Sequence, residues 1–399
     1  MSRLWTKEAA VGLVVAGTVL LGPAQAAWAA PAWELRAMSV PEAWAVSRGD
    51  GVTVAVIDSG IRTGHEALKG RATEGPDMLN ENDKDAPYYG RHGTAMASHV
   101  LDVAPGAKVL GLRTIRDDGD PKLDERQEGF GQPTGGSEPN DPYALAIAKA
   151  VDLDADVISL SLGTDDLALF KRSTAQAAAI AYATSRGIPV VASAGNSGDT
   201  GNGVSYPANY PGVIAVAASN KAGARADFST VHSYVDVAAP GQQVAAADIR
   251  GGRSRVSGTS SAGALTAGVV ALIKSKYPDL APRQIEQVLI RTASRYDEGH
   301  DPFRGYGLVD AEAALKAAGA LKPEPATLPA TRYEGPAHFG PGDDGTPLNV
   351  NQPLEKGMLA LGGGVAVPGV LAILGGVLLL LSGRRARRRA GGAGTGGGG

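Results

Sequence analysis

The chain has 399 residues, of which 43% are hydrophobic and 20% are charged, and its formal net charge is −3. This composition is typical of one large α/β domain with appended segments, and it gives no basic signal for nucleic-acid binding. The chain contains no cysteine, which excludes disulfide bonds, thiolate zinc sites and a cysteine nucleophile.

The N-terminus has the three regions of a signal peptide. Two basic residues precede an apolar stretch over residues 9–22, and small-residue triplets follow at 24–26 and 27–29. Either triplet fits a cleavage site, so we expect residues 1–29 to direct export. An uncleaved anchor is the alternative, although the apolar run is short for a membrane span.

Strand and helix patterns alternate over the next three hundred or so residues of the sequence. Short apolar runs rich in β-branched and small residues predict buried strands at 52–57, 109–115, 156–162, 188–194 and 213–218. Helices are predicted at 142–151, 173–186, 260–277 and 282–293. This alternation implies an α/β domain over residues 30–320, with helices on both faces of a mainly parallel sheet.

Two polar residues stand next to these apolar patterns at positions that suit catalysis. Asp58 ends the first strand, at the carboxyl edge where open α/β sheets place their active sites. Alone, it could also cap the next segment or bind the ribose of a nucleotide. His92 is followed by Gly93 and other small residues, which suit a tightly packed helix. A lone histidine is more often a structural or surface residue.

Two further residues lie where an oxyanion could be stabilised. Asn196 is in a Gly-Asn-Ser-Gly turn after a buried strand, so its amide could face a cleft, or it could simply be a turn residue. Ser260 is in a Gly-Thr-Ser turn that opens into an apolar helix. Unpaired N–H groups and the helix dipole at such a position favour developing negative charge, which suits a nucleophile.

The chain order Asp58, His92, Asn196, Ser260, with the flanking motif of each residue, resembles that of the subtilisin-like serine proteases. The resemblance implies that Ser260 attacks the scissile carbonyl and that His92 accepts its proton, while Asp58 orients the imidazole. Asn196 and the backbone N–H of Ser260 would hold the oxyanion. The implied protein is an endopeptidase that acts on proteins or peptides without a cofactor.

The likeness extends over about residues 50–320 and implies the three-layer subtilisin-like fold. The substrate-binding positions of the family correspond to Ser161, Leu162, Gly163, Ala192, Ser193, Ala194 and Ser205. The first three would pair with the substrate backbone as an added strand, and the others surround the primary specificity pocket. Ser205 stands where the family often has glycine, so we expect large substrate side chains to be disfavoured.

Three other features of the domain have simpler interpretations. Residues 261–264 read Ser-Ala-Gly-Ala where the family commonly has Met-Ala-x-Pro, which we expect to change local rigidity rather than mechanism. The acidic segment 117–141 is predicted to be a solvated insertion loop, with partner docking or control of cleft access as the alternative. It has no regular metal-ligand spacing. Structural or surface roles are expected for His65, His99, His232, His300 and His338.

The C-terminal segments predict a membrane anchor. Residues 358–381 form an uncharged stretch of 24 residues, enough to cross about 30 Å of hydrocarbon. Five arginines follow between 384 and 389, which by the positive-inside rule puts the basic, glycine-rich tail 382–399 in the cytoplasm. The proline-rich residues 321–357 would form a semi-rigid linker. We therefore expect a single-pass cell-membrane protein with its peptidase domain outside the cytoplasm.

This order of segments is similar to that of the mycosins, membrane-anchored proteases associated with the type VII secretion systems of actinobacteria. About 20 residues separate the signal peptide from the subtilisin-like region, which leaves no room for a long folding-assisting propeptide. Many mycosins carry cysteines, whereas this chain has none. The resemblance implies action on or with a type VII secretion complex. A structural subunit with dispensable proteolysis and a general cell-surface protease are the alternatives.

Overall fold

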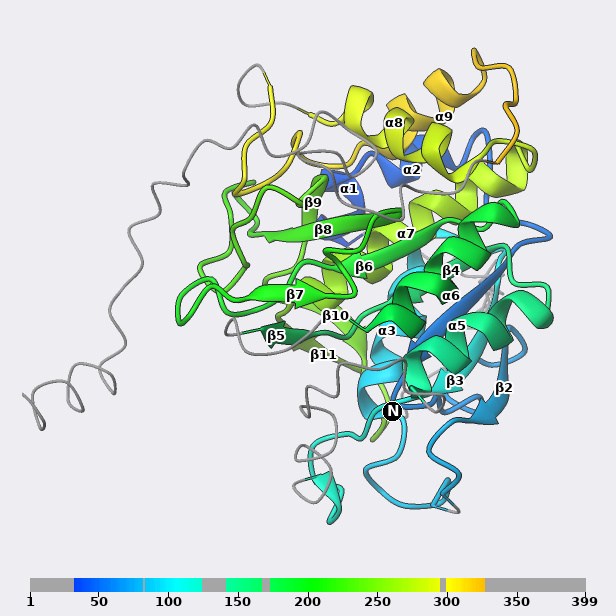
Figure 1. The fold of residues 1–399 in the computed structure, drawn as a ribbon, viewed down its shortest axis with the longest axis vertical. Coiled ribbons are helices and arrows are strands. Elements are labelled where there is room, and N and C mark those ends of the chain that lie inside the picture. Colours follow the sequence, from blue (N-terminus) through cyan, green and yellow to red (C-terminus); the bar gives the residue numbers. More distant parts are fainter. Residues whose placement is uncertain (1–31, 82, 124–140, 167–172, 295–298, 327–399) are drawn as a thin grey trace, which may run out of the picture. The chain divides into compact units, whose positions relative to one another are not determined.

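The computed structural model describes residues 32–81, 83–123, 141–166, 173–294 and 299–326 (Figure 1). The predicted signal peptide, the predicted span and tail, and most of the predicted linker lie outside these residues. Within the described ranges, no helix combines the length and the apolar character that crossing a membrane requires.

Seven parallel strands form the central sheet, in the order β2-β3-β1-β4-β6-β8-β9. They are β1 (Thr53–Asp58), β2 (Ala72–Asp77), β3 (Lys108–Arg113), β4 (Val157–Leu160), β6 (Val190–Ser193), β8 (Val213–Ser219) and β9 (Val237–Pro240). The strands after β1 first add on one side of it, and β4 then adds on the other. The strand order therefore reverses between β1 and β4, which is where sheets of this kind open a crevice at their carboxyl edge.

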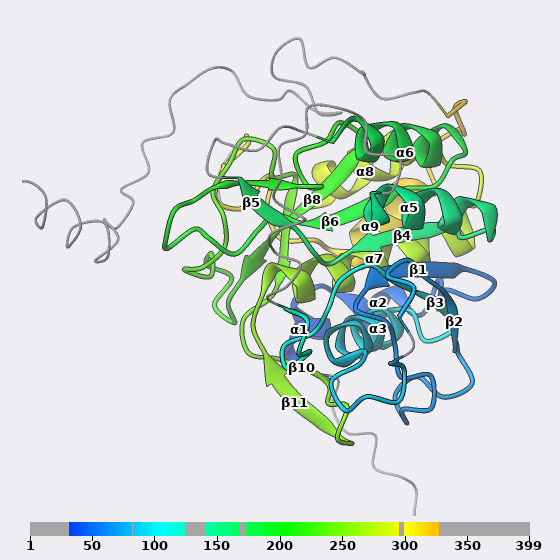
Figure 2. The same cartoon turned by 60° about the horizontal axis from the view of Figure 1, so that its bottom comes forward.

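Helices cover both faces of this sheet (Figure 2). They are α3 (Arg91–Val103) and α7 (Thr259–Lys276) on one face, and α5 (Pro142–Asp152) and α6 (Thr174–Ser185) on the other. In β1, Val54 and Val56 belong to the apolar cluster under α3 and α7, whereas Ala55 and Ile57 belong to the cluster under α5 and α6. Side chains alternate along a strand, so a strand that is apolar throughout needs cover on both faces. The predicted α/β architecture with a mainly parallel sheet is confirmed.

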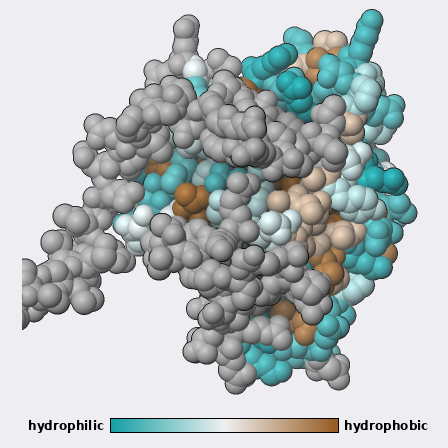
Figure 3. All heavy atoms as spheres, viewed as in Figure 1, coloured by the Kyte–Doolittle hydropathy of each residue, from teal (hydrophilic) through white to brown (hydrophobic). Residues whose placement is uncertain are grey.

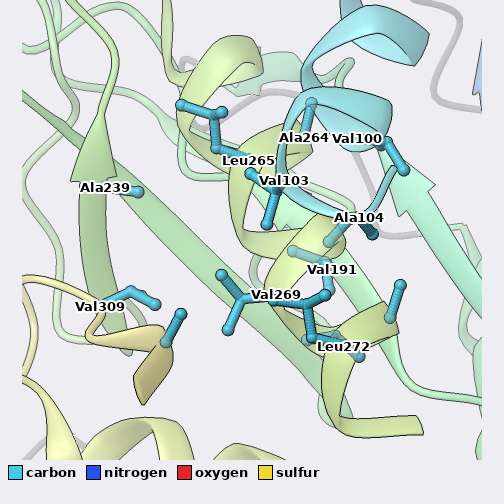
Figure 4. Close-up of a cluster of buried hydrophobic side chains, with 14 of the residues drawn as sticks. Val100, Val103, Ala104, Val191, Ala239, Ala264, Leu265, Val269, Leu272 and Val309 are labelled. Atoms are coloured by element: carbon cyan, nitrogen blue, oxygen red, sulfur yellow. The ribbon is translucent and has the colours of Figure 1, made fainter. Parts of the chain in front are cut away.

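The close approach of α3 and α7 matters for the site, because each helix carries a predicted site residue at its first turn. Their side chains form one apolar cluster (Figure 4). A Cβ added at Gly268 of α7 would lie 2.6 Å from the Val103 Cβ and 3.0 Å from the Val100 carbonyl oxygen of α3. Glycine at this position therefore lets the two helices approach closely.

Smaller elements complete the described part. They are α1 (Trp33–Ala37), α2 (Val40–Ala43), α8 (Pro282–Thr292), α9 (Ala311–Ala318), the antiparallel pair β5 (Thr164–Asp166) with β7 (Val204–Tyr206), and the hairpin β10 (Val244–Ala247) with β11 (Arg253–Val256). The Met38 carbonyl accepts a hydrogen bond from the Ala311 N–H, and the buried Glu34 carboxylate accepts one from the Ala245 N–H. The segment before β1 thus packs on the domain.

The outer surface of α5 and α6 is less polar than the surface around it (Figure 3). Leu145, Leu153 and Tyr182 are the large hydrophobic residues exposed there. Scattered exposed apolar side chains of this kind are normal on a folded domain.

Candidate active site

Asp58 and His92 meet at the carboxyl edge of the sheet. Asp58 is the last residue of β1 and is fully buried, and His92 is the second residue of α3. The Nδ1 atom of His92 lies 2.8 Å and 3.0 Å from the two carboxylate oxygens of Asp58. Because a carboxylate only accepts hydrogen bonds, Nδ1 carries the hydrogen, and Nε2 of the neutral ring is left as a proton acceptor.

Gly93 allows α3 to begin directly against the turn after β1. A Cβ at this position would lie 2.0 Å from the Gly60 carbonyl oxygen and 3.2 Å from the Asp58 Cβ. No side chain fits there without moving the backbone. His92 can therefore approach Asp58 this closely only because the next residue, Gly93, has no side chain.

The electrostatic surroundings of His92 favour its charged form. Burial lowers the pKa of His92, but the charge and hydrogen bond of Asp58 and the charges of Asp117 and Asp118 outweigh it. Together they raise the pKa from 6.5 to about 9. The imidazolium form of this residue is thus stabilised by three carboxylates.

Asp117 is a site feature that the sequence did not reveal. Its carboxylate accepts hydrogen bonds from the backbone N–H groups of Arg91 at 2.7 Å and of His92 at 2.8 Å, which have no partner within α3 because they lie in its first turn. Burial raises the pKa of Asp117, although the hydrogen bond from the His92 N–H lowers it. Asp117 and Asp120 are both buried, so the prediction of a solvated loop is wrong for these two residues. Residues 124–140 of the predicted loop lie outside the described residues.

Ser260 is the second residue of α7, and it contacts the end of β4. Its hydroxyl donates to the Ser161 carbonyl oxygen at 3.0 Å, and the Ser161 hydroxyl donates to the Ser260 carbonyl oxygen at 3.0 Å. A hydroxyl has one hydrogen, so in this arrangement the Ser260 hydrogen is directed to Ser161 and not to His92. The Ser260 N–H lies in the first turn of α7, where no partner exists within the helix.

The amide of Asn196 is oriented by Thr259. Its Oδ1 atom accepts from the backbone N–H and from the hydroxyl of Thr259, both at 2.9 Å. A backbone N–H can only donate, so the atom facing it is the oxygen and the NH₂ group faces away. A Cβ placed on Gly258 would lie 3.9 Å from the Asn196 Nδ2 atom and 3.7 Å from the Ser260 backbone nitrogen. These two donors therefore flank the same glycine.

The expected substrate-binding segments meet around Ser205. Residues 161–163 lead into β5, which pairs with β7 so that Asp165 lies opposite Ser205. A Cβ at Gly163 would lie 2.6 Å from the Ser205 Oγ, and the Ser193 hydroxyl lies 3.4 Å from the Leu162 carbonyl oxygen. The segment at 161–163 is thus joined to both other parts of the expected pocket.

Tyr234 links the two sides of this pocket. Its hydroxyl accepts from the Ser205 N–H at 3.0 Å and donates to the Ala194 carbonyl oxygen at 2.9 Å. Sequence reasoning missed this role, since no motif marks Tyr234 as a neighbour of either segment. Ala192 is fully buried inside β6 and belongs to the apolar cluster under α5 and α6, as Leu162 and Ala194 do.

An acidic cluster lies beside the end of β3. One oxygen from each of Glu81, Asp83 and Asp120 lies within 4.8 Å of the others, which is an arrangement that can hold a cation. Two buried arginines reach into it. Arg113 pairs with Asp83, and Arg116 pairs with Glu81 and, at 3.3 Å, with Asp120. The guanidinium groups therefore neutralise the carboxylates that a metal ion would otherwise bind.

Known proteins that are similar to this chain in sequence agree with the site geometry described above. A family model described as the subtilase family matches residues 49–308. Subtilisin NAT of Bacillus subtilis subsp. natto is 35% identical over an alignment of 278 residues, and the match covers 67% of this chain and 66%, just under two thirds, of that protein. Mycosin-1 of Mycobacterium tuberculosis is 30% identical over 395 residues, covering 83% of each chain.

Solved structures are similar as well. The MycP3 protease from the type VII (ESX-3) secretion system has a TM-score of 0.59 and 29% identity, over 71% of this chain and 87% of that one. MycP1, described as a serine protease and an essential component of the type VII (ESX-1) secretion system, has a TM-score of 0.59 and 27% identity, over 71% and 88%. The likeness to mycosins expected from the sequence is confirmed, and the chain belongs to the subtilase family.

Proposed function

We propose that this chain hydrolyses peptide bonds with Ser260 as the nucleophile, His92 as the general base and Asp58 as the residue that orients the imidazole. The observation that carries the proposal is the hydrogen bond from His92 Nδ1 to Asp58, because it leaves Nε2 as the proton acceptor. The position of Ser260 in the first turn of α7 supports the same assignment.

The reaction begins when the Ser260 hydroxyl turns from the Ser161 carbonyl to His92. As Oγ bonds to the scissile carbon, its proton passes to Nε2, and the buried Asp58 stabilises the resulting imidazolium. The substrate carbonyl oxygen becomes an oxyanion, held by the Asn196 NH₂ group and the Ser260 N–H. His92 then protonates the leaving amine, the C–N bond breaks, and water hydrolyses the acyl ester by the same proton transfers.

A small primary specificity pocket fits this proposal. The Ser205 hydroxyl occupies space directly over Gly163, and it has no hydrogen-bond partner within the described residues. Extra atoms in a closed pocket leave less volume for the substrate side chain that precedes the scissile bond. We infer that the enzyme prefers small residues such as alanine at that position.

Hydrolysis of a short peptide by the purified chain tests the enzymatic proposal. Ser260→Ala should lower the rate by several orders of magnitude without unfolding the protein. Ser257→Ala is the matched control, since Ser257 is three residues away and its exposed hydroxyl accepts hydrogen bonds from Gln243. Comparable hydrolysis by the Ser260→Ala protein would overturn the proposal.

We also propose that the chain acts on or with a type VII secretion system, as the mycosin resemblance implies. The similarity to Mycosin-1 supports this role, because it extends over 83% of the chain and not only over the peptidase domain. A deletion strain that carries the Ser260→Ala protein is the test. Failure to secrete despite normal expression supports a proteolytic role, and restored secretion favours a structural subunit. Degradation of unrelated unfolded proteins would favour a general cell-surface protease.

Anchoring by residues 358–381, with the peptidase domain outside the cytoplasm, is part of the same proposal. Its support is the uncharged stretch followed by five arginines, together with the signal-like N-terminus. The chain has no cysteine, so single cysteines can be introduced without background labelling. A membrane-impermeant maleimide should label Ser257→Cys in intact cells and should not label Thr395→Cys. The reverse pattern would overturn the topology.

A further inference from the structure

A second histidine–serine pair lies beside the proposed catalytic residues. His99 is on α3, seven residues after His92, and Ser261 follows Ser260 on α7. His99 Nε2 lies 3.1 Å from Ser261 Oγ, and both side chains are buried. The pair His99–Ser261 therefore bridges the same two helices that carry the proposed base and nucleophile, but in the interior.

His99 is neutral in this environment. Burial, with smaller effects from the charges of Arg253 and His92, lowers the pKa of His99 to about 3. Its Nδ1 atom is also buried and has no hydrogen-bond partner within the described residues. Either tautomer of the neutral ring gives one hydrogen bond between the two side chains, because Nε2 can donate to the Ser261 hydroxyl or accept from it.

Burial of this polar pair is costly in its surroundings. Met96, Val100, Ala262 and Leu265 lie next to these two residues along the helices and belong to the apolar cluster between α3 and α7. Two apolar residues of similar volume would pack there with no hydrogen-bonding requirement. The hydrogen bond constrains the relative orientation of α3 and α7, because it weakens when the two helices rotate or slide, whereas apolar contacts adapt.

The first turn of α7 is held from three sides. Thr259 donates to Asn196 in the turn after β6, and Ser260 exchanges hydrogen bonds with Ser161 at the end of β4. Ser261 is bonded to His99 of α3. Of these three connections, the one from Ser261 joins α7 to the helix that carries His92.

We propose that His99 is a positioning residue that acts through Ser261. It sets the rotation of the first turn of α7 relative to α3, and thereby the distance that the Ser260 Oγ must bridge to reach His92 Nε2. His99 itself touches neither the substrate nor the reacting atoms. This inference rests on the proposed peptidase function.

Steady-state kinetics of the full chain test it. The variant His99→Leu with Ser261→Ala removes both polar groups, so no buried donor is left unpaired and the melting temperature should stay the same or rise. We expect kcat to fall about tenfold or more, because small misplacements of reacting groups carry penalties up to about a hundredfold. KM should stay within about twofold, since the pocket is unchanged.

Thr266→Val is the matched control. Thr266 is buried on the same helix, and its hydroxyl bonds within α7 to the Ala262 carbonyl oxygen at 2.9 Å. Loss of this hydroxyl should change the melting temperature and leave kcat unchanged. His99→Gln, which keeps an N–H donor, should retain most of the wild-type kcat.

The outcomes separate the two proposals. A wild-type protein without peptidase activity contradicts the proposed function itself. An active wild type whose doubly substituted variant keeps the full kcat overturns only the positioning role of His99. If the double variant does not fold, Ser261→Ala alone decides, since a lowered kcat at unchanged KM supports the role and a wild-type kcat refutes it.

Discussion

Ser161 and Ser260 bind each other reciprocally, with each hydroxyl donating to the backbone carbonyl oxygen of the other at 3.0 Å. The pair ties the end of β4 to the start of α7, across the point where the strand order of the sheet reverses. It also directs the hydrogen of the proposed nucleophile away from His92. Attack on a substrate therefore requires one rotation of the Ser260 side chain.

The pH dependence of hydrolysis should follow the neutral form of His92. Because its pKa is raised to about 9, the base form increases as pH rises through that value, and kcat/KM should rise with it. The rate at pH 7 should be about one hundredth of its alkaline plateau. A profile that levels off near pH 6.5 would contradict this expectation.

The raised pKa of His92 should make the folded state less stable at high pH, where hydrolysis is fastest. A histidine whose pKa is higher in the folded state stabilises the fold fully below its unfolded value of 6.5, and this stabilisation is lost as pH rises toward 9.

A matched pair of variants tests whether the charge of Asp118 contributes to the raised pKa of His92. Asp118→Asn should move the midpoint of the pH–rate profile to lower pH by a few tenths of a unit, and by less at high salt. The exposed Asp152, on α5, is the control position.

Asn196→Asp tests the NH₂ group of the Asn196 side chain separately from its oxygen. The substitution keeps an oxygen that accepts from Thr259, but it replaces the NH₂ group with a second oxygen. We expect kcat to fall by about a hundredfold to a thousandfold, with little change in the melting temperature. A kcat near the wild-type value would show that the Asn196 amide does not hold the oxyanion.

Ser205→Gly should widen the primary specificity pocket. The hydroxyl lies over Gly163, where a Cβ would be 2.6 Å away, so its removal frees volume for a larger substrate side chain. Wild type should cleave after alanine faster than after phenylalanine, and the variant should improve phenylalanine relative to alanine by about tenfold. Faster cleavage after phenylalanine by the wild type would refute a small pocket.

Arg113→Leu should destabilise the fold strongly. Arg113 is buried, and its guanidinium pairs with Asp77, Asp83 and Asp120. Removing the cation leaves the buried Asp120 and the partly buried Asp77 and Asp83 carboxylates facing one another, which should lower the free energy of unfolding by about 3–5 kcal/mol. Urea denaturation measures the effect. Arg250→Leu, the control, breaks an exposed pair with Asp248 and should leave the urea midpoint nearly unchanged.

Strands and helices with strong apolar patterns could be predicted from the sequence. The strands β1, β3, β4, β6 and β8 and the helices α5, α6, α7 and α8 all lie at predicted positions, with ends that differ by a few residues. The strand β2 was not predicted, because its sequence, Ala-Thr-Glu-Gly-Pro-Asp, has no apolar run. It lies at the edge of the sheet, where a strand pairs on one side only.

The polar contacts around the site could not be predicted in the same way. Asp117 accepts hydrogen bonds from backbone groups 25 and 26 residues earlier, and His99 meets Ser261 across 162 residues. Such contacts depend on the packing of whole elements and leave no periodic pattern in the sequence. The motifs around Asp58, His92 and Ser260 were recognisable because their local spacing is itself the signal.

Labelling of the folded chain with a fluorophosphonate, followed by mapping of the modified residue, tests directly whether Ser260 is a nucleophile activated by His92. Such reagents react with a serine hydroxyl only when a neighbouring base activates it. We expect one adduct, on Ser260, and its loss in the His92→Ala protein. An adduct on another residue, or equal labelling of Ser260 without the His92 imidazole, would contradict it.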